Sequence, residues 1–141
     1  IPTGARPEGS ALSPDGKLLY VVNREAAQIT VIDTGTQSAA GVIPTGKGPV
    51  RVQAAPDGAI VYALMHDKAV GFADPKTRKE VATVALGGNP VSLALSPDGA
   101  LAYAAAQDLD TVYVISVKDR KIVRQIKTAP EMFPDAILPL R

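Results

Sequence analysis

The phrase "SPDGKLLYVVN" at residues 13–23 recurs twice further along the chain. Its relatives are "APDGAIVYALM" at residues 55–65 and "SPDGALAYAAA" at residues 96–106. Each contains a Pro-Asp-Gly turn, in which proline presets φ, aspartate bonds back to the backbone and glycine accepts a positive φ. An apolar run follows each turn, which is typical of a strand. A phrase spelled three times indicates a repeat architecture.

The spacing of equivalent residues gives the repeat period. Gly16, Gly58 and Gly99 lie 42 and 41 residues apart. The same steps separate Tyr20, Tyr62 and Tyr103, as well as Pro7, Pro49 and Pro90. A period of about 40–45 residues with several short strands per unit favours propeller blades, an array or a solenoid. The repeats run approximately over residues 1–42, 43–83 and 84–125, and a fourth starts within 126–141.

Each unit is predicted to contain four strands. In the first unit the first three are expected at residues 9–12, 18–22 and 29–32. The fourth strand is clearest in the second unit, at residues 80–84. The second strand is apolar at every position, so both of its faces must be covered, as in a blade between two neighbours. The fourth carries Lys and Arg, which suit an outer edge strand. The sequence therefore predicts an all-β fold, with β-propeller blades of four antiparallel strands, about three blades plus one extra inner strand.

These motifs resemble the YVTN family of β-propeller repeats. The resemblance rests on residues 13–16 with 20–23, on "VIDT" at 31–34 and on "IPTG" at 43–46. It covers nearly the whole chain, although the second unit ends in Met65 and the third reads Ala-Ala-Ala. The resemblance implies about seven blades, and seven such units need roughly 290 residues. The chain is then about half of a propeller.

A partial propeller leaves apolar faces bare on its two end blades, and such faces need a cover. We expect the cover to be the remainder of the propeller or a second chain. Residues 133–138 look like the innermost strand of a fourth blade. The chain begins at Ile1, inside a repeat, so we expect a processed product or a piece of a longer protein.

Composition excludes several classes of protein. The formal net charge is +1, which gives no general attraction to nucleic acid. Cysteine is absent, so disulfides, thiolate metal sites and cysteine nucleophiles are excluded. No apolar run reaches the roughly 18 residues of a membrane span. The sequence also lacks a phosphate loop, a dinucleotide fingerprint and a serine nucleophile elbow.

Candidate ligand-binding residues lie in the loops that build the ligand face of a propeller. They are Arg6, Arg24, Arg51, His66 and Gln107. Arg6 and Arg51 flank equivalent prolines near the start of inner strands, where a guanidinium suits a small anionic ligand such as a carboxylate or phosphate. Arg24, His66 and Gln107 fall at one equivalent position of the three units. Alternatively, all five are solvated loop residues that vary because nothing constrains them.

His66 is the only histidine, so a histidine-rich metal site within this chain is impossible. It can still be one ligand to a metal or heme completed by another chain, or a general base. We predict no metal site, no catalytic residue and no cofactor within this chain, and leave the full assembly open. The turn carboxylates Asp15, Asp57 and Asp98 are interpreted as turn formers on the opposite face.

Three functions remain open. The first is a binding or scaffold module, not an enzyme by itself, within a larger periplasmic or extracellular propeller that binds a small molecule or protein. The location is implied by the family resemblance. The second is part of a propeller-type oxidoreductase, since similar propellers form the large subunit of quinoprotein amine dehydrogenases and the heme d1 domain of nitrite reductases. The third is a lactonase-like hydrolase.

Overall fold

A computed structural model describes residues 1–130, which form three four-stranded antiparallel sheets. The first holds β1 (Pro7–Leu12), β2 (Leu18–Asn23), β3 (Gln28–Asp33) and β4 (Ser38–Pro44). The second holds β5 (Pro49–Ala54), β6 (Ile60–Leu64), β7 (Ala69–Asp74) and β8 (Lys79–Ala85). The third holds β9 (Pro90–Leu95), β10 (Leu101–Ala106), β11 (Thr111–Ser116) and β12 (Lys121–Lys127). A single 3-10 turn, η1 (Gln107–Leu109), is the only helical segment of residues 1–130.

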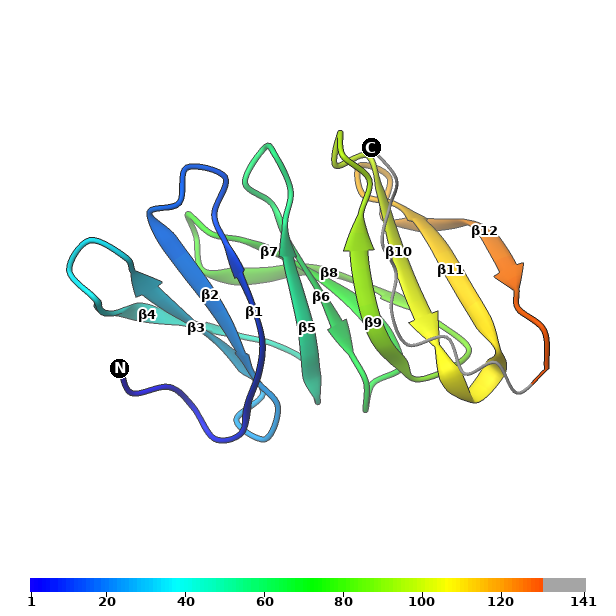
Figure 1. The fold of residues 1–141 in the computed structure, drawn as a ribbon, viewed down its shortest axis with the longest axis horizontal. Helices are drawn as coiled ribbons and strands as arrows, with labels where there is room; N and C mark the ends of the chain where they lie inside the picture. Colours follow the sequence, from blue (N-terminus) through cyan, green and yellow to red (C-terminus); the bar gives the residue numbers. More distant parts are fainter. Residues whose placement is uncertain (131–141) are drawn as a thin grey trace.

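Each sheet is one blade, and its strands pair in chain order. The blades follow one another as in a propeller, and β5 lies between β1 and β9 (Figure 1). The first strand of each blade is therefore the inner one. The last strand is the outer one, and β12 is exposed along almost its whole length. The predicted β-propeller fold, with four antiparallel strands per blade, is confirmed.

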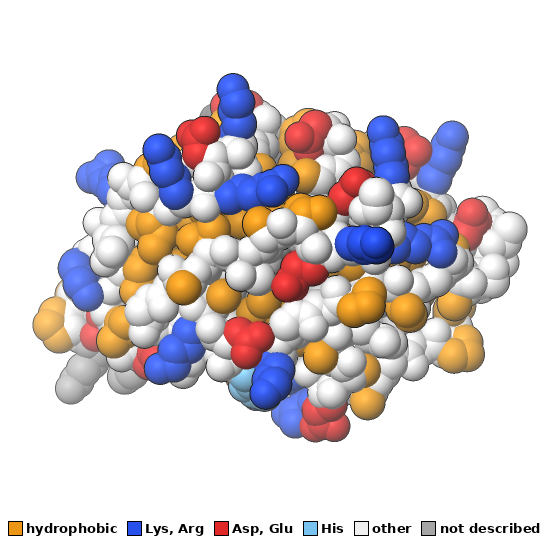
Figure 2. Space-filling view, turned by 180° about the vertical axis from the view of Figure 1, so that it is seen from behind, with side chains coloured by type: hydrophobic (Ala, Val, Ile, Leu, Met, Phe, Trp, Pro, Cys, Tyr) orange, Lys and Arg blue, Asp and Glu red, His pale blue; other side chains and the backbone are white. Residues whose placement is uncertain are grey.

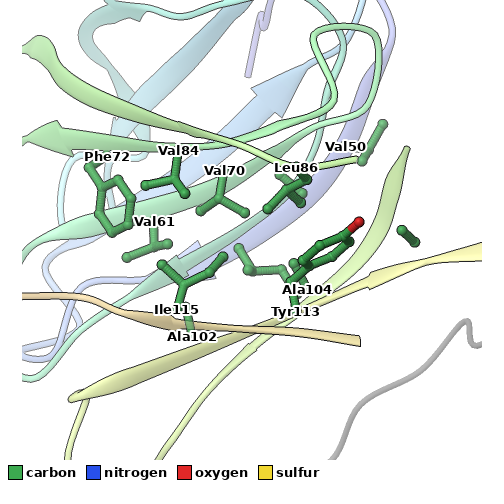
Figure 3. Packing of buried hydrophobic residues seen from close by; sticks show 13 residues of the cluster. Val50, Val61, Val70, Phe72, Val84, Leu86, Ala102, Ala104, Tyr113 and Ile115 are labelled. Atoms are coloured by element: carbon green, nitrogen blue, oxygen red, sulfur yellow. The ribbon is translucent and has the colours of Figure 1, made fainter. Parts of the chain in front are cut away.

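Two apolar clusters hold the three blades together. One joins the first blade to the second through residues such as Tyr20, Ile29 and Tyr62. The other joins the second to the third, where Phe72 and Val84 face Ile115 (Figure 3). Every residue of β6 is buried, because this strand contributes side chains to both clusters. The continuous apolar run of β6 is thus explained by a blade that is covered on both faces.

The Pro-Asp-Gly turn of the second blade is one residue shorter than its counterparts. In the first blade the Ser13 N–H donates to the Leu18 carbonyl, 2.8 Å away. In the second the Ala55 N–H donates to the Ala59 carbonyl, also at 2.8 Å. The third blade closes like the first. In the second blade the acceptor residue therefore lies four positions after the donor residue, whereas in the other two blades it lies five positions after it.

Because of this difference, the tyrosine of the second blade points to the opposite face of its sheet. Tyr20 pairs with Val31, and Tyr62 pairs with Gly71, which is one position out of step. Successive side chains of a strand point to opposite faces, so a shift of one residue sends Tyr62 to the other side of its sheet. The three tyrosines are equivalent in sequence. In the structure, only Tyr20 and Tyr103 take the same place.

One face of the first blade has no other sheet packed on it among residues 1–130. Strand register places two rows of side chains on this face. The first row consists of Ser10, Val21, Thr30 and Val42. The second row consists of Leu12, Leu19, Ile32 and Ala39. Leu12 is 56% exposed and Val42 is 46% exposed, whereas Val21, Thr30 and Ile32 of the same rows are buried. We call these two rows the open face of the first blade.

Within residues 1–130 no helix is long and apolar enough to cross a membrane. The expected inner strand of a fourth blade, at residues 133–138, lies outside the described residues.

Candidate ligand face

The loops chosen from the sequence gather at one end of the blades. Pro7 at the start of β1 pairs with Asn23 at the end of β2, so the segment before β1 meets the β2–β3 loop. In the second blade Pro49 pairs with Leu64 in the same way. The Pro-Asp-Gly turns follow the far ends of the inner strands. We call the first end, with Arg6, Arg24, Arg51 and His66, the arginine face.

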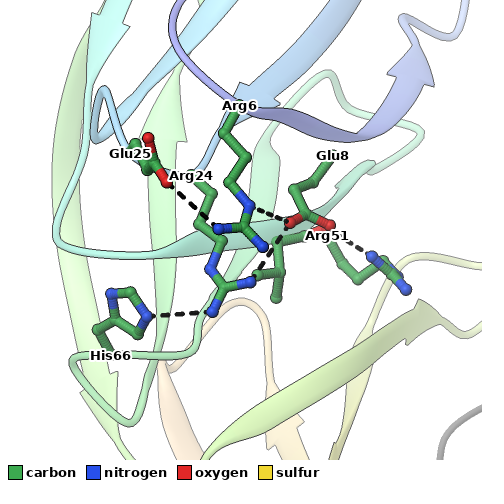
Figure 4. A network of polar contacts seen from close by, with 7 residues as sticks. Arg6, Glu8, Arg24, Glu25, Arg51 and His66 are labelled. Carbon is green, nitrogen blue, oxygen red and sulfur yellow. Dashed lines mark hydrogen bonds and ion pairs between the residues drawn. The ribbon is translucent and has the colours of Figure 1, made fainter.

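A network of ion pairs occupies this face (Figure 4). Arg6 Nη1 donates to Glu25 Oε1 over 3.2 Å, and Arg6 Nε lies 3.6 Å from Glu8 Oε1. The same oxygen of Glu8 accepts a hydrogen bond from Arg24 Nη1 at 3.4 Å. One carboxylate thus holds two guanidinium groups in position.

The network continues from the first blade to the second. Arg24 Nη2 lies 3.3 Å from His66 Nε2, which belongs to the loop between β6 and β7. A guanidinium has no acceptor, so Nε2 must accept and the imidazole proton must sit on Nδ1. Arg24 is thereby fixed at both of its terminal nitrogens.

Arg51 lies beside this network but is bound differently. Its Nη1 donates to the backbone carbonyl of Val50 at 2.8 Å, and it forms no ion pair within residues 1–130. Its aliphatic stem runs past Gly9 of β1, where an added Cβ would lie 3.5 Å from Arg51 Cδ. Gln107 sits in η1, and no hydrogen bond or ion pair joins its side chain to the network within residues 1–130.

The charges of the network are paired unevenly. Arg6 and Arg24 are paired with Glu8 and Glu25, whereas Arg51 has no carboxylate partner within residues 1–130. The Arg6 side chain is 54% exposed and that of Arg24 is 22% exposed. Exposed ion pairs contribute only about 0–1 kcal/mol each, so an incoming anion can replace them at small cost. This arrangement is suited to holding a carboxylate or a phosphate.

Sequence reasoning missed Glu8, which lies at the centre of the network. A signal was present, because Glu8 follows Pro7 at the position where the other two units carry Val50 and Val91. A single charged residue among equivalent apolar ones deserves notice.

The predicted equivalence of His66 with Arg24 and Gln107 is wrong by one residue. Arg24 and Gln107 come directly after β2 and β10, whereas Met65 comes directly after β6. His66 is therefore the second residue of its loop. The cause is again the shorter turn of the second blade, which shifts everything that follows it.

Two acidic residues of the same loops have structural duties. Asp67 Oδ2 accepts from the Lys47 backbone N–H at 2.6 Å, and Asp108 Oδ1 accepts from that of Asn89 at 2.8 Å. Each carboxylate ties a loop to the linker between two blades. Residues 1–130 contain no group of three or more His, Asp or Glu side chains placed to hold a metal ion.

Comparison with known protein families gives one match. Residues 14–136 match the family described as the cytochrome D1 heme domain. No curated protein matches the sequence of this chain.

Solved structures with a similar fold include Kuenenia stuttgartiensis hydrazine synthase, with a TM-score of 0.87 and 26% identity over 92% of this chain. Two further structures, U3-55K and the WD40 repeats of RRP9, each give a TM-score of 0.82 at 13% identity over 92% of this chain. At that identity they show the fold alone. This chain spans 38%, 42% and 41% of the lengths of the three matched chains, respectively.

Proposed function

The chain belongs to the cytochrome D1 heme domain family, and from this premise we propose that it is a ligand-binding part of a larger propeller. Its arginine face would hold an anionic small molecule, and a heme is the ligand class that the family suggests. Arg51 carries this proposal. It is a guanidinium beside an ordered network, and its described polar contact is to a backbone carbonyl, so its remaining donors are available to a ligand.

The side chains of the arginine face fit the polar edge of a heme. Three guanidinium groups would suit the carboxylates of a heme, and the imidazole of His66 would suit coordination of its iron. His66 Nε2 accepts from Arg24 at 3.3 Å, so either Arg24 must release it or Nδ1 must serve. An enclosed apolar slot for the ring is not among the described residues of this face. The apolar residues that enclose the heme ring would come from the rest of the propeller.

A second candidate function is a part of a propeller-type oxidoreductase. The family match and the 26% identity to hydrazine synthase favour it over the hydrolase expected as a further alternative. A bound heme supplies a redox-active iron, and the residues named here would bind and orient it. A lactonase-like hydrolase would need clustered acids or metal ligands, and residues 1–130 hold no group of three such ligands.

The proposal also includes the setting of the protein. The rest of the propeller would cover the end blades, and the assembly would work in the periplasm or outside the cell. The YVTN type of repeat stays part of this proposal. Cell fractionation with an antibody to the chain tests the location, and a cytoplasmic signal alone would contradict it.

Absorption spectroscopy tests the ligand. Hemin is titrated into the purified chain, and the Soret band reports binding. We expect the variant with both Arg51→Ala and His66→Ala to bind hemin at least about tenfold more weakly, which corresponds to about 1.4 kcal/mol. His66→Ala alone should alter the band position, because it removes the only imidazole.

Arg124→Ala, on the exposed outer strand β12, is the matched control, because it removes a guanidinium far from the arginine face in the fold. Its hemin affinity should equal that of the unaltered chain. Equal losses for Arg124→Ala and Arg51→Ala would mean unspecific attraction. Full affinity in the double variant would overturn the proposal.

A further inference from the structure

A cleft of about 720 Å³ opens at the other end of the blades, between the second and third sheets. Its volume falls within the range of about 300–1,000 Å³ that is usual for small-molecule sites. Four turns surround it, namely the Pro-Asp-Gly turns at residues 55–59 and 97–100 and the turns before β8 and β12. Figure 2 shows Lys and Arg side chains, with Asp and Glu between them, along the upper edge of the molecule. From the sequence, we expect only turn-forming carboxylates at this end.

Six charged residues line the cleft. They are Asp57, Asp74, Asp98, Lys76, Lys118 and Arg120. None of them forms an ion pair within residues 1–130, where the ion pairs all belong to the arginine face. Opposite charges that surround one hollow without meeting are available to a bound molecule.

Five of the six charged residues are separated by sign within the cleft. Asp57 and Asp98 belong to the turns that follow the inner strands β5 and β9. Lys76, Lys118 and Arg120 belong to the turns that precede the outer strands β8 and β12. Strand order therefore puts Asp57 and Asp98 at the inner end and the three cations at the outer end, where Asp74 at the end of β7 also lies.

The carboxylates at the inner end keep free acceptor capacity. Asp57 Oδ1 accepts from the Ala59 N–H at 2.9 Å, and Asp98 Oδ1 accepts from Ser96 Oγ and from the Ala100 N–H. The second carboxylate oxygen of each residue has no hydrogen-bond donor within residues 1–130. An ammonium or guanidinium group would be bound there by two anions.

The floor between the two ends is apolar. Phe72 and Ala73 of β7, Val81 of β8 and Val117 of the third blade line it. Val81 is 43% exposed, so its side chain is accessible to a molecule in the cleft. A ligand that spans the cleft would place an apolar middle over these side chains.

The corresponding groove between the first and second blades is occupied by the protein itself. Arg78 lies against Gly41 of β4, where an added Cβ would collide with its guanidinium. Gly41 pairs with Val31, and its counterpart Ala82 pairs with Phe72 in the second blade. Arg120 of the third blade corresponds to Arg78 of the second. The methyl group of Ala82 fills the space that Gly41 leaves open for Arg78, so Arg120 cannot pack in the same way.

From these observations we infer that the cleft is a second binding site, specific for a short peptide segment with opposite charges at its two ends and apolar residues between them. The basic end lies at Asp57 and Asp98. The acidic end lies at Lys118 and Arg120. This site is separate from the arginine face, and its existence does not depend on the proposed heme-type ligand.

Fluorescence anisotropy with labelled, capped tetrapeptides tests the inference. The probe is Lys-Val-Leu-Glu, and the comparison peptides are Lys-Val-Leu-Lys and Glu-Val-Leu-Glu. We expect the full chain to bind the dipolar probe at least about fivefold more tightly than either comparison peptide, since each of those places one like charge in the cleft. Equal binding of Glu-Val-Leu-Glu, or no binding of the probe, would overturn the inference.

Two variants probe the two ends. Lys118→Glu with Arg120→Glu should weaken binding of the probe about tenfold or more, and Asp57→Asn with Asp98→Asn should do so as well. The matched controls are Arg124→Glu on β12 and Asp15→Asn in the turn of the first blade, neither of which lines the cleft. The controls should keep the affinity of the unaltered chain. Retained affinity in both cleft variants, with melting curves that show a folded protein, would rule the site out.

Discussion

The ring of Tyr62 lies across the bare backbone of Gly71, its partner on the neighbouring strand. The two residues are paired in register, and three ring carbons of Tyr62 are the nearest atoms to a Cβ built on Gly71. Tyr62 is fully buried between the first and second blades. Its hydroxyl passes beyond Gly71 and donates to Glu80 Oε2 on β8 at 2.6 Å. The absence of a side chain at residue 71 makes this path possible.

Gly71→Ala should therefore destabilise the protein, by about 1–3 kcal/mol as for other overpacked cores. The new methyl group has to displace a buried aromatic ring. Urea unfolding followed by circular dichroism measures the loss. The first blade supplies a matched rescue, because Val21 and Thr30 stand where the second has Tyr62 and Gly71. Tyr62→Val combined with Gly71→Ala should cost less than the sum of the two single changes. Strict additivity would contradict the steric account.

Tyr62→Phe should cost about 1–2 kcal/mol, because it removes a hydrogen bond to a carboxylate. The same oxygen of Glu80 accepts from the Gly46 N–H at 3.1 Å, so the bond also steadies the linker between blades. Burial, followed by the bond to Glu80, raises the pKa of Tyr62 above its usual range, so the hydroxyl stays a donor at neutral and mildly alkaline pH. Tyr103→Phe is the control, since its hydroxyl has no hydrogen-bond partner within residues 1–130. Thermal melts should show a clear loss for Tyr62→Phe and little for Tyr103→Phe.

Asp15 should contribute stability that depends on pH. The hydrogen bond from Ser13 Oγ, and then that from the Lys17 N–H, lower the pKa of this carboxyl below its usual 3.8. A lowered pKa in the folded state stabilises the protein above the unfolded pKa, and the gain is lost as pH falls through the folded value. Asp15→Asn should therefore lower the melting temperature at pH 7 and have progressively less effect below about pH 4.

Asp57→Asn is the comparison for that experiment. The second blade has Ala55 in place of Ser13, so Asp57 lacks the serine hydroxyl bond. Its bond from the Ala59 N–H can be kept by an asparagine oxygen. Melting curves at several pH values should show a smaller change for Asp57→Asn than for Asp15→Asn. An equal change at both positions would mean that the serine bond is unimportant.

The 141-residue chain on its own should associate in solution. The open face of the first blade exposes Leu12 and Val42, and apolar sheet faces of this kind need a cover. Sedimentation velocity should show dimers or larger species. Leu12→Lys with Val42→Lys should shift the distribution toward the monomer, because two charges would then have to be buried at the contact. A compact monomer of the unaltered chain that melts cooperatively would refute this expectation.

The strands and the blades could be predicted from the amino-acid sequence. The repeat of Pro-Asp-Gly and tyrosine fixed the turns, and the apolar runs fixed which strands are buried on two faces, so β2, β6 and β10 are found where they were expected. The arginine-face loops were also found together, because strand order alone decides which loops share an end of a blade.

The side of the sheet that each residue faces after the turn of the second blade became apparent only in the folded chain. Gly16 and Tyr20 are separated by the same number of residues as Gly58 and Tyr62, so the two turns look alike in sequence. The hydrogen bond that closes the turn spans one residue fewer in the second blade than in the first. Because side chains alternate along a strand, this one residue turns Tyr62 to the opposite face of its sheet. It also makes His66 the second residue of its loop and not the first. The pairing of Glu8 with Arg24 was likewise settled in space, because it joins β1 to the β2–β3 loop, whose side chains meet only when the blade has formed.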